Sequence, residues 1–324
     1  MTSKCCEAVR VAFLCFALCC GFTSCLNASE KTASSGLSHY IMGVIYEDEG
    51  SLDKALAEYK EAAKADPTSP LIHLRLASTY IKSSLFEEAT SQAKEVVALN
   101  PQAAEPHALL ALIYSLEKKL DLAAVEYEQA LEKASRSNPK DIQIQKSLGE
   151  IYFWRKDYEA AEKVYKLILG LSPQDAQAHF YLGIIYEEQK KPKEAQEEFK
   201  AAISIDPAYA DALNSLGYIY AEQGINLDEA LALINKALEI DAGNAAYIDS
   251  LGWAYFKKGR YDEAVKELER AVALMEDPVI FDHLGDAYFK KGLLDKAREN
   301  WEKSLSLDEK QEPVKKKIEE LEKK

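Results

Sequence analysis

The sequence predicts an all-α protein, a right-handed superhelical solenoid of eight stacked helical hairpins that ends in a capping helix. Three observations lead to this prediction. A pattern of tyrosine, small and alanine residues recurs about every 34 residues between residues 36 and 311. Each recurrence holds two apolar runs with helical spacing, separated by a short polar break. One such hairpin cannot bury its own apolar face, so we expect neighbouring hairpins to stack.

Three positions mark every unit of the repeat. An aligned tyrosine occupies the first in all eight units: Tyr46, Tyr80, Tyr114, Tyr152, Tyr186, Tyr220, Tyr255 and Tyr288. A small residue three positions earlier lets two helix backbones approach, with the tyrosine filling the gap beside it: Gly43, Ala77, Ala111, Gly149, Gly183, Gly217, Gly252 and Gly285. An alanine follows nine or ten residues after the tyrosine: Ala55, Ala89, Ala123, Ala161, Ala195, Ala230, Ala264 and Ala297.

Prolines and glycines set the boundaries of the units. The eight predicted units are 36–69, 70–103, 104–141, 142–175, 176–209, 210–244, 245–277 and 278–311. Prolines end five of them, at Pro67, Pro101, Pro139, Pro173 and Pro207. Glycines between the two helices act as C-caps at Gly50, Gly224, Gly259 and Gly292. The third unit carries four extra residues in EKASRSNPKD, and residues 312–324 form the capping helix, with an apolar stripe of Val314, Ile318 and Leu321.

This pattern resembles the tetratricopeptide repeat (TPR), whose 34-residue consensus is W-x2-L-G-x2-Y, then A-x3-F and P. Position four departs from the consensus, because His, Gln or an aliphatic residue, and Phe281 in the last unit, stands where the family often has Trp. The resemblance implies a binding protein in which the first helix of each hairpin lines a concave groove. It also implies a scaffold or adaptor for other proteins rather than an enzyme, with no cofactor.

The amino-terminal segment predicts export. All six cysteines lie in the first 25 residues, and Val11 to Phe22 is an apolar run of 12 residues, shorter than the ~20 that a membrane span requires. The sequence Phe22-Thr23-Ser24-Cys25 resembles the bacterial lipoprotein cleavage motif, which implies a signal peptide over 1–24 and lipid attachment at Cys25. An ordinary secretory signal or an uncut anchor is the alternative interpretation.

A lipid-anchored chain would belong to the bacterial envelope. Residues 25–35 are then the acylated cysteine and a flexible polar tether. Leu26 stands where an Asp often signals retention at the inner membrane, so we expect the periplasmic face of the outer membrane. The alternative is a soluble, secreted or periplasmic TPR chaperone or regulator that carries no lipid.

Charge and motifs exclude several other classes of protein. With 54 acidic and 40 basic residues the net charge is -14, which disfavours a nucleic-acid surface. No Walker loop, G-x-S-x-G, H-E-x-x-H or dinucleotide-binding turn occurs. We expect no metal site, because histidines at the same position of successive hairpins lie ~8–10 Å apart and cannot share one ion. His283, between Asp282 and Asp286, is the weak exception.

The predicted binding site lies on the first helices of the last three units, where aromatic and acidic residues alternate. The candidate partner-binding residues are Asn214, Tyr218, Asp249, Trp253, Phe256, Asp282, Asp286 and Phe289. Trp253 and Tyr218 stand where the family usually has a small or amide residue, and exposed Trp and Tyr are typical hot spots. The local excess is acidic, so we expect a partner segment with apolar and basic side chains. The Lys and Asn clamp by which some TPR proteins grip a terminal carboxylate is absent.

Overall fold

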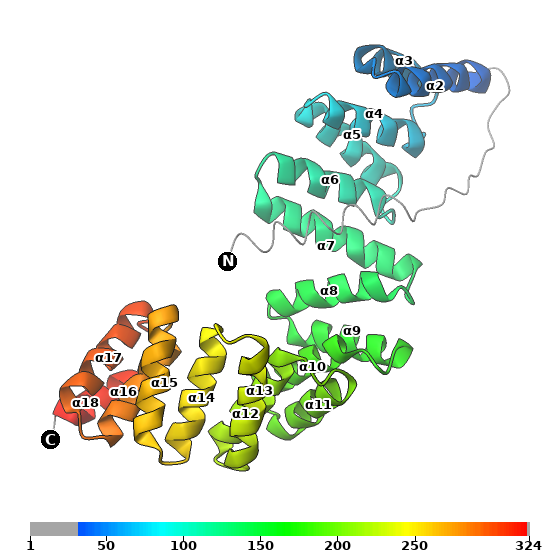
Figure 1. Cartoon of the computed structure of the whole chain (residues 1–324). Coiled ribbons are helices and arrows are strands. Elements are labelled where there is room, and N and C mark those ends of the chain that lie inside the picture. The colour runs from blue at the N-terminus through cyan, green and yellow to red at the C-terminus, as the bar shows by residue number, and fades with distance from the viewer. Residues whose placement is uncertain (1–31, 323–324) are drawn as a thin grey trace. The chain divides into compact units, whose positions relative to one another are not determined.

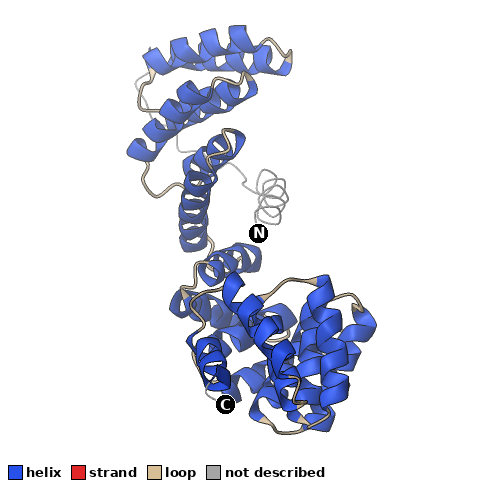
Figure 2. Cartoon of the chain, turned by 90° about the vertical axis from the view of Figure 1, so that its left-hand side faces the viewer, coloured by secondary structure: helices blue, strands red, loops and turns tan. Residues whose placement is uncertain are grey.

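The computed structural model describes residues 32–322, and the side chains of residues 36–321. Within this part of the chain there are 17 helices, α2 to α18, and no strand (Figures 1 and 2). The predicted all-α fold of paired helices is therefore confirmed. The predicted signal peptide, Cys25 and most of the tether lie outside the described residues. Among the residues searched, every helix is too short or too polar to cross a membrane.

The amino-terminal unit of the fold extends to Ala130 and contains three hairpins. Its helices are α2 (Thr32–Asp48) with α3 (Leu52–Ala65), α4 (Pro70–Lys82) with α5 (Phe86–Leu99), and α6 (Glu105–Leu116) with the first part of α7 (Leu120–Ser137). Short turns join the two helices of each hairpin, so the pair is antiparallel. α2 begins at Thr32, so the end of the predicted tether is helical.

The carboxy-terminal unit begins at Leu131 and contains five complete hairpins (Figure 1). Its paired helices are α8 (Ile142–Trp154) with α9 (Tyr158–Leu171), α10 (Ala176–Glu188) with α11 (Pro192–Ile205), α12 (Ala210–Gln223) with α13 (Leu227–Ile240), α14 (Ala245–Lys257) with α15 (Tyr261–Leu274), and α16 (Pro278–Lys290) with α17 (Leu294–Leu307). The last helix, α18 (Glu312–Glu322), follows α17 and packs against it. From α8 to α17 the second helix of each hairpin also contacts the first helix of the next, which makes the core continuous along the unit.

The turns inside the hairpins confirm the predicted glycine caps. Gly50, Gly224, Gly259 and Gly292 all adopt the left-handed conformation, with φ between 67° and 77°. The equivalent turns without glycine strain a side-chain-bearing residue instead, because Ser84, Lys118, Lys156 and Lys190 have φ near 60°. The turn geometry is thus imposed by the packing of the hairpins, and glycine is the residue that accepts it at least cost.

The small residue of each first helix is required by close contact with the second helix. A Cβ placed on Gly183 would lie 2.5 Å from the ring of Phe199, and one on Gly285 would lie 2.5 Å from the indole of Trp301. The group that fills this space therefore comes from the second helix, whereas the sequence had indicated the aligned tyrosine. That tyrosine is buried at Tyr80, Tyr186, Tyr220 and Tyr288 and partly buried in the other four units.

The extra residues of the third unit lengthen its second helix. α7 has 18 residues, whereas each of the other second helices has 14. The insertion therefore does not begin as a loop, because Glu132 to Ser137 are helical. At the other end, Val314 and Leu321 of α18 are buried in a core cluster that also contains Trp301 and Leu284.

Candidate partner-binding surface

The eight residues predicted to bind a partner lie on three successive first helices of the carboxy-terminal unit. α12 carries Asn214 and Tyr218, α14 carries Asp249, Trp253 and Phe256, and α16 carries Asp282, Asp286 and Phe289. The structure joins these helices by polar contacts between side chains about one repeat apart. Most of the predicted residues therefore already have a partner inside the chain, which changes what they can offer to another protein.

Trp253 is buried, with 7% of its surface exposed, so the expectation of an exposed hot spot is wrong for this residue. Its Nε1 donates a hydrogen bond to Glu222 at 2.7 Å. Its indole stacks on the ring of Phe256, with centroids 4.8 Å apart, and on the imidazole of His283, at 4.0 Å. The cause lies in the stacking of repeats, because His283 of the following repeat covers the ring. A role of Trp253 in partner binding stays a prediction.

Asp249 and His283 form a buried ion pair between the last two hairpins. Nδ1 of His283 lies 2.9 Å from Oδ1 of Asp249, and both residues are less than 9% exposed. Burial is the largest single influence and would lower the pKa of His283, but the charge and hydrogen bond of Asp249, together with the charges of Asp282 and Asp286, raise it above its ordinary value. The histidine that the sequence placed between Asp282 and Asp286 thus faces a carboxylate of the preceding helix. Among the described residues no group of His, Cys, Asp or Glu side chains is arranged to hold a metal ion.

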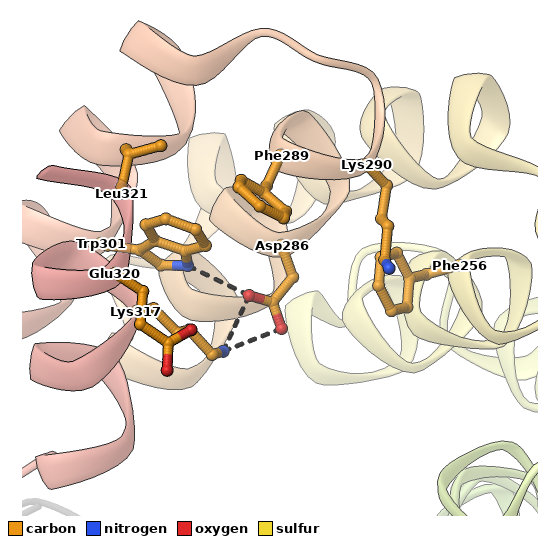
Figure 3. A pocket seen from close by; sticks show the side chains of 8 residues that line it. All are labelled: Phe256, Asp286, Phe289, Lys290, Trp301, Lys317, Glu320 and Leu321. Atoms are coloured by element: carbon orange, nitrogen blue, oxygen red, sulfur yellow. Dashed lines mark hydrogen bonds and ion pairs between the residues drawn. The ribbon is translucent and has the colours of Figure 1, made fainter. Parts of the chain in front are cut away.

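Asp282 and Asp286 are held by Lys317 of α18. The Lys317 Nζ lies 2.6 Å from Oδ1 of Asp282 and 2.8 Å from Oδ2 of Asp286. Figure 3 shows the contact between Lys317 and Asp286. Trp301 Nε1 also donates to Asp286, at 3.2 Å. Burial raises the pKa of Asp286, and Lys317 opposes this rise. These groups border a hollow of about 180 Å³ whose lining residues are Phe256, Asp286, Phe289, Lys290, Trp301, Lys317, Glu320 and Leu321.

The acidic excess expected on the last two hairpins is therefore largely neutralised within the chain. Asp249 pairs with His283, and the two carboxylates of α16 share Lys317. The hollow between α16 and α18 presents aromatic rings beside Lys290 and Lys317 as well as carboxylates. The expected acidic excess was counted along each helix, whereas these ion pairs form between side chains of different helices. On α12, Tyr218 is partly buried, and the Oδ1 atom of Asn214 is buried without a hydrogen-bond partner among the described residues.

A further carboxylate of this unit belongs to Glu187, a residue that the sequence analysis had not selected. Glu187 lies in the last turn of α10 and is partly buried. No described residue forms a hydrogen bond or an ion pair with its side chain. Burial raises its pKa, and the charge of the neighbouring Glu188 raises it further, although Lys190 opposes both. Burial raises the pKa of Tyr218, and the charges of Glu222, Asp249 and Glu187 raise it further.

The first hairpin shows how the chain neutralises the equivalent carboxylate. Glu47 follows the aligned tyrosine of the first unit, as Glu187 follows that of the fifth, 140 residues later (187 − 47). Glu47 accepts hydrogen bonds from Tyr59 at 2.7 Å and Lys82 at 2.6 Å, and Arg75 lies 3.9 Å away. Burial would raise the pKa of Glu47, but these neighbours lower it below its ordinary value.

Each of these three neighbours is replaced in the fifth and sixth units. The residues 140 positions after Tyr59, Arg75 and Lys82 are Phe199, Ser215 and Glu222. At these positions Glu187 therefore has no hydroxyl, guanidinium or ammonium group, and the residue equivalent to Lys82 is acidic. We call Glu187, Tyr218 and Glu222 the Glu187 cluster. The sequence indicates this cluster when equivalent positions of different units are compared.

Four other histidines form contacts within their own hairpins. His39, His107 and His179 each contact a glutamate 19 residues later on the second helix, and His73 contacts Gln92 at the same spacing. The distances from Nδ1 to the side-chain oxygen are 2.6 to 2.7 Å. These histidines join the two helices of a hairpin, which agrees with the packing role expected from their position in the repeat.

An exposed aromatic residue lies one hairpin before the Glu187 cluster. Trp154, the last residue of α8, is 72% exposed. Its ring meets Phe153 edge-on with centroids 5.6 Å apart, and Phe153 in turn contacts Tyr181 of α10 at 5.1 Å. Trp154 thus presents the exposed aromatic surface that Trp253 does not.

Comparison with known proteins identifies the repeat. Models described as tetratricopeptide repeat match residues 47–113, 128–176, 176–209, 210–244, 245–278 and 280–311. A stretch of 131 residues, 40% of this chain, is 27% identical to the general transcriptional corepressor trfA of Dictyostelium discoideum and spans 9% of that protein. Another of 112 residues, 35% of this chain, is 29% identical to the protein O-mannosyl-transferase TMTC1 of Homo sapiens and spans 12% of it.

Solved structures share the fold. One similar structure is a chain of the APC/C hetero-tetramer Cut9–Hcn1, with a TM-score of 0.58 and 16% sequence identity. The match covers 83% of the present chain and 52% of that chain. At that identity the likeness concerns the fold alone. The two relatives identified by sequence are matched over only about a tenth of their length, so the likeness is to their repeats.

Proposed function

The chain belongs to the tetratricopeptide repeat family, whose members are usually non-enzymatic scaffolds for protein–protein interaction, and from this premise we propose a more specific role. We propose that it is a lipid-anchored adaptor of the bacterial envelope, attached through Cys25 at the periplasmic face of the outer membrane. In this proposal it binds partner segments with basic and apolar side chains along the first helices of its carboxy-terminal unit.

The Glu187 cluster is the observation that carries the binding proposal. In the first hairpin Tyr59 and Lys82 donate hydrogen bonds to Glu47. For Glu187, the residue equivalent to Lys82 is a glutamate, Glu222. A half-buried carboxylate without a counter-ion is unfavourable, and a cation that arrives from outside relieves this cost. The cluster therefore favours a lysine or arginine side chain of the partner, in the place that Lys82 occupies beside Glu47.

The surroundings of the cluster favour apolar neighbours of that cation. Tyr218 lies on the first helix of the next hairpin and is partly buried, and Trp154 on the hairpin before Glu187 has an exposed ring. Aromatic faces attract both apolar side chains and cations, so a segment that alternates basic and apolar residues matches this surface better than an acidic one. Glu222 is itself contacted by Lys257 at 3.3 Å, whereas none of the described residues forms an ion pair with Glu187.

Binding of model peptides tests the chemical part of the proposal. Affinity would be measured by calorimetry between the full chain and an extended peptide of alternating Leu and Lys, with the Leu and Glu peptide as comparison. We expect Glu187→Gln to weaken binding of the Lys peptide, and Glu222→Lys to abolish it by restoring an internal pair like that of Glu47 and Lys82. Glu159→Gln, at an exposed position on α9, is the matched control. Equal affinity for both peptides, or no effect of Glu222→Lys, contradicts the assignment.

The anchor is tested separately. Cells that express the chain would be labelled with a fatty acid, and the wild type would be compared with Cys25→Ser. The proposal expects label and membrane partitioning in the wild type and their loss in the variant. A soluble, unlabelled wild type would instead favour a soluble chaperone or regulator, and it would leave the peptide-binding result unaffected.

A further inference from the structure

The hollow beside α18 is bordered by three aromatic rings. Phe256 of α14, Phe289 of α16 and Trp301 of α17 line it, together with Leu321 of α18 (Figure 3). Its volume is about 180 Å³. An apolar cavity of ~150 Å³ engineered into another protein holds one benzene ring, so this hollow has room for one side chain of that size.

The preceding interface between first helices shows what fills the equivalent space. Between α14 and α16 the indole of Trp253 stacks on Phe256, with centroids 4.8 Å apart and an angle of 6° between the rings, and on His283, at 4.0 Å. The Nζ atom of Lys257 lies 4.7 Å from the centroid of the same indole. The chain therefore places an aromatic ring between these two helices, stacked on a phenylalanine and next to a cation.

Helix α18 stands to α16 as α16 stands to α14. His283 of α16 pairs with Asp249 of α14, and Lys317 of α18 pairs with Asp282 of α16 at 2.6 Å. Asp282 follows Asp249 by 33 residues, and Lys317 follows His283 by 34 (282 − 249 and 317 − 283). The two interfaces are therefore built alike, and their residues can be compared position by position.

This comparison locates a missing ring. The phenylalanine and the cation of the preceding interface recur 33 residues later as Phe289 and Lys290 (289 − 256 and 290 − 257), and both border the hollow. The residue 33 positions after Trp253 is Asp286 (286 − 253). An aspartate side chain is much smaller than an indole, which accounts for the unfilled space at this position.

The charges around the hollow favour an occupant without a net charge. Two lysines, Lys290 and Lys317, border it, and so do two carboxylates, Asp286 and Glu320. An anionic side chain would meet the carboxylates, and a cationic one would meet the ammonium groups. An aromatic ring has a negative face that attracts the lysines and a positive edge that attracts the carboxylates.

We propose that the hollow bordered by α14, α16, α17 and α18 binds one aromatic side chain of Phe or Tyr size from a partner protein. The bound ring stacks on Phe289 beside Lys290, as Trp253 stacks on Phe256 beside Lys257. Free small molecules bind mostly in pockets of ~300–1,000 Å³, so this smaller hollow suits one side chain of a partner that is also held elsewhere. The inference rests on the proposed binding of partner segments along the first helices and adds an aromatic anchor to it.

Fluorine NMR of the full chain, labelled with fluorotryptophan, tests the hollow without a partner. The chain has three tryptophans, and their signals are assigned by replacing each in turn. The amide of N-acetylphenylalanine should shift the signal of Trp301, because this indole borders the hollow. The amide of N-acetylcyclohexylalanine has a similar shape but no π-system, so it should bind at least about threefold more weakly.

Two variants with matched controls locate the bound ring. Phe289→Leu removes the stacking ring and should abolish the difference in affinity between the two amides. Phe281→Leu, on the same helix but outside the hollow, should keep it. Lys290 is exposed, so Lys290→Met preserves the fold and should reduce the difference. Lys291→Met should keep it, because Lys291 pairs with Asp262 and does not border the hollow.

Peptides distinguish this inference from the proposed function. Phe replaces each Leu of the Leu and Lys peptide in turn, and calorimetry with the full chain should find a position at which affinity rises by about threefold or more. No shift of the Trp301 signal, equal affinity for the two amides, no improved Phe position, or a difference that survives Phe289→Leu would each overturn the aromatic site, even when the Lys peptide binds through Glu187. Binding of the Phe amide beside Trp301 without binding of any Lys peptide would support the ring site and contradict the proposed function.

Discussion

Nδ1 of His283 lies 2.9 Å from Oδ1 of Asp249, and this buried pair joins the first helices of the last two hairpins. The imidazole is also stacked on Trp253 with ring centroids 4.0 Å apart. Because the interface between neighbouring repeats determines the cooperativity of a solenoid, this contact couples the end of the array to the repeats before it. It also makes the stability of that interface depend on pH.

Stability should decrease when the pH rises above the range in which His283 is protonated. The pKa of His283 is raised from its ordinary 6.5, so its pairing energy is fully present below about pH 6.5 and is lost as the pH rises through the higher pKa of the folded state. We expect the difference in free energy of unfolding between wild type and His283→Gln to be largest below pH 6.5 and to shrink towards alkaline pH. Urea unfolding at a series of pH values measures this difference.

Asp249→Asn provides the control for this pH dependence. Without this carboxylate the largest influence left on the pKa of His283 is burial, which lowers it, and only the weaker charges of Asp282 and Asp286 oppose that, so the extra stability at low pH should shrink. A difference between wild type and His283→Gln that grows with pH would contradict the assignment of the pair as charged.

The two tryptophans of α8 and α14 should respond oppositely to truncation. Trp253 is 7% exposed and is covered by the next repeat, so Trp253→Ala should destabilise the chain by about 3–5 kcal/mol. Trp154 is 72% exposed, so Trp154→Ala should change stability by less than about 0.5 kcal/mol. Thermal and urea unfolding check both values. A stable Trp253→Ala variant would show that the ring is not part of the packing between repeats.

Lys317 should matter more than other lysines of α18. Lys317→Met leaves Asp282 and Asp286 without their cation, and we expect a loss of about 1–2 kcal/mol, since the three groups are 19% to 28% exposed and partly screened by water. Lys315→Met removes an exposed pair with Glu312 and should have no measurable effect. Calorimetry of the two variants compares them directly. Equal effects would mean that α18 is held by its apolar residues alone.

Two glycines in helices should differ in their tolerance of alanine. Gly183→Ala places a methyl group 2.5 Å from Phe199 and should cost about 1–3 kcal/mol, because the ring must move. No atom lies within 4 Å of the equivalent position at Gly170, so Gly170→Ala should stabilise α9 by up to about 1 kcal/mol through helix propensity. Midpoints of urea unfolding distinguish the two outcomes. If Gly183→Ala is also stabilising, the helices of that hairpin are less closely packed than the structure shows.

The position of the glycines, tyrosines and alanines in the sequence was sufficient to predict the hairpins. The four glycine caps were also predictable, because a positive φ at a turn has a direct signature in residue type. The candidate site was less predictable. Sequence spacing placed Asp249, Trp253 and Asp282 on the first helices. It could not show that Asp249 pairs with His283 and that Asp282 pairs with Lys317.

Glu187 shows the same limit of sequence-based prediction, because it is a candidate site residue that the sequence analysis did not select. In the sequence it is one of many glutamates, and only its burial and the identity of its neighbours distinguish it from Glu47. Those neighbours lie on other helices, up to 35 residues away for Glu47 and Lys82. Once the stacking of hairpins is known, the comparison of equivalent positions becomes meaningful.

The sequence by itself thus determined the elements of this protein, its family and the net charge of -14. These depend on local patterns, because helix periodicity, turn chemistry and a repeat of about 34 residues all act within one or two units. The tertiary structure alone decided which charges are paired and which tryptophan is exposed. These depend on contacts between units, where desolvation and Coulomb attraction act over a few ångströms in space and over many residues in the chain.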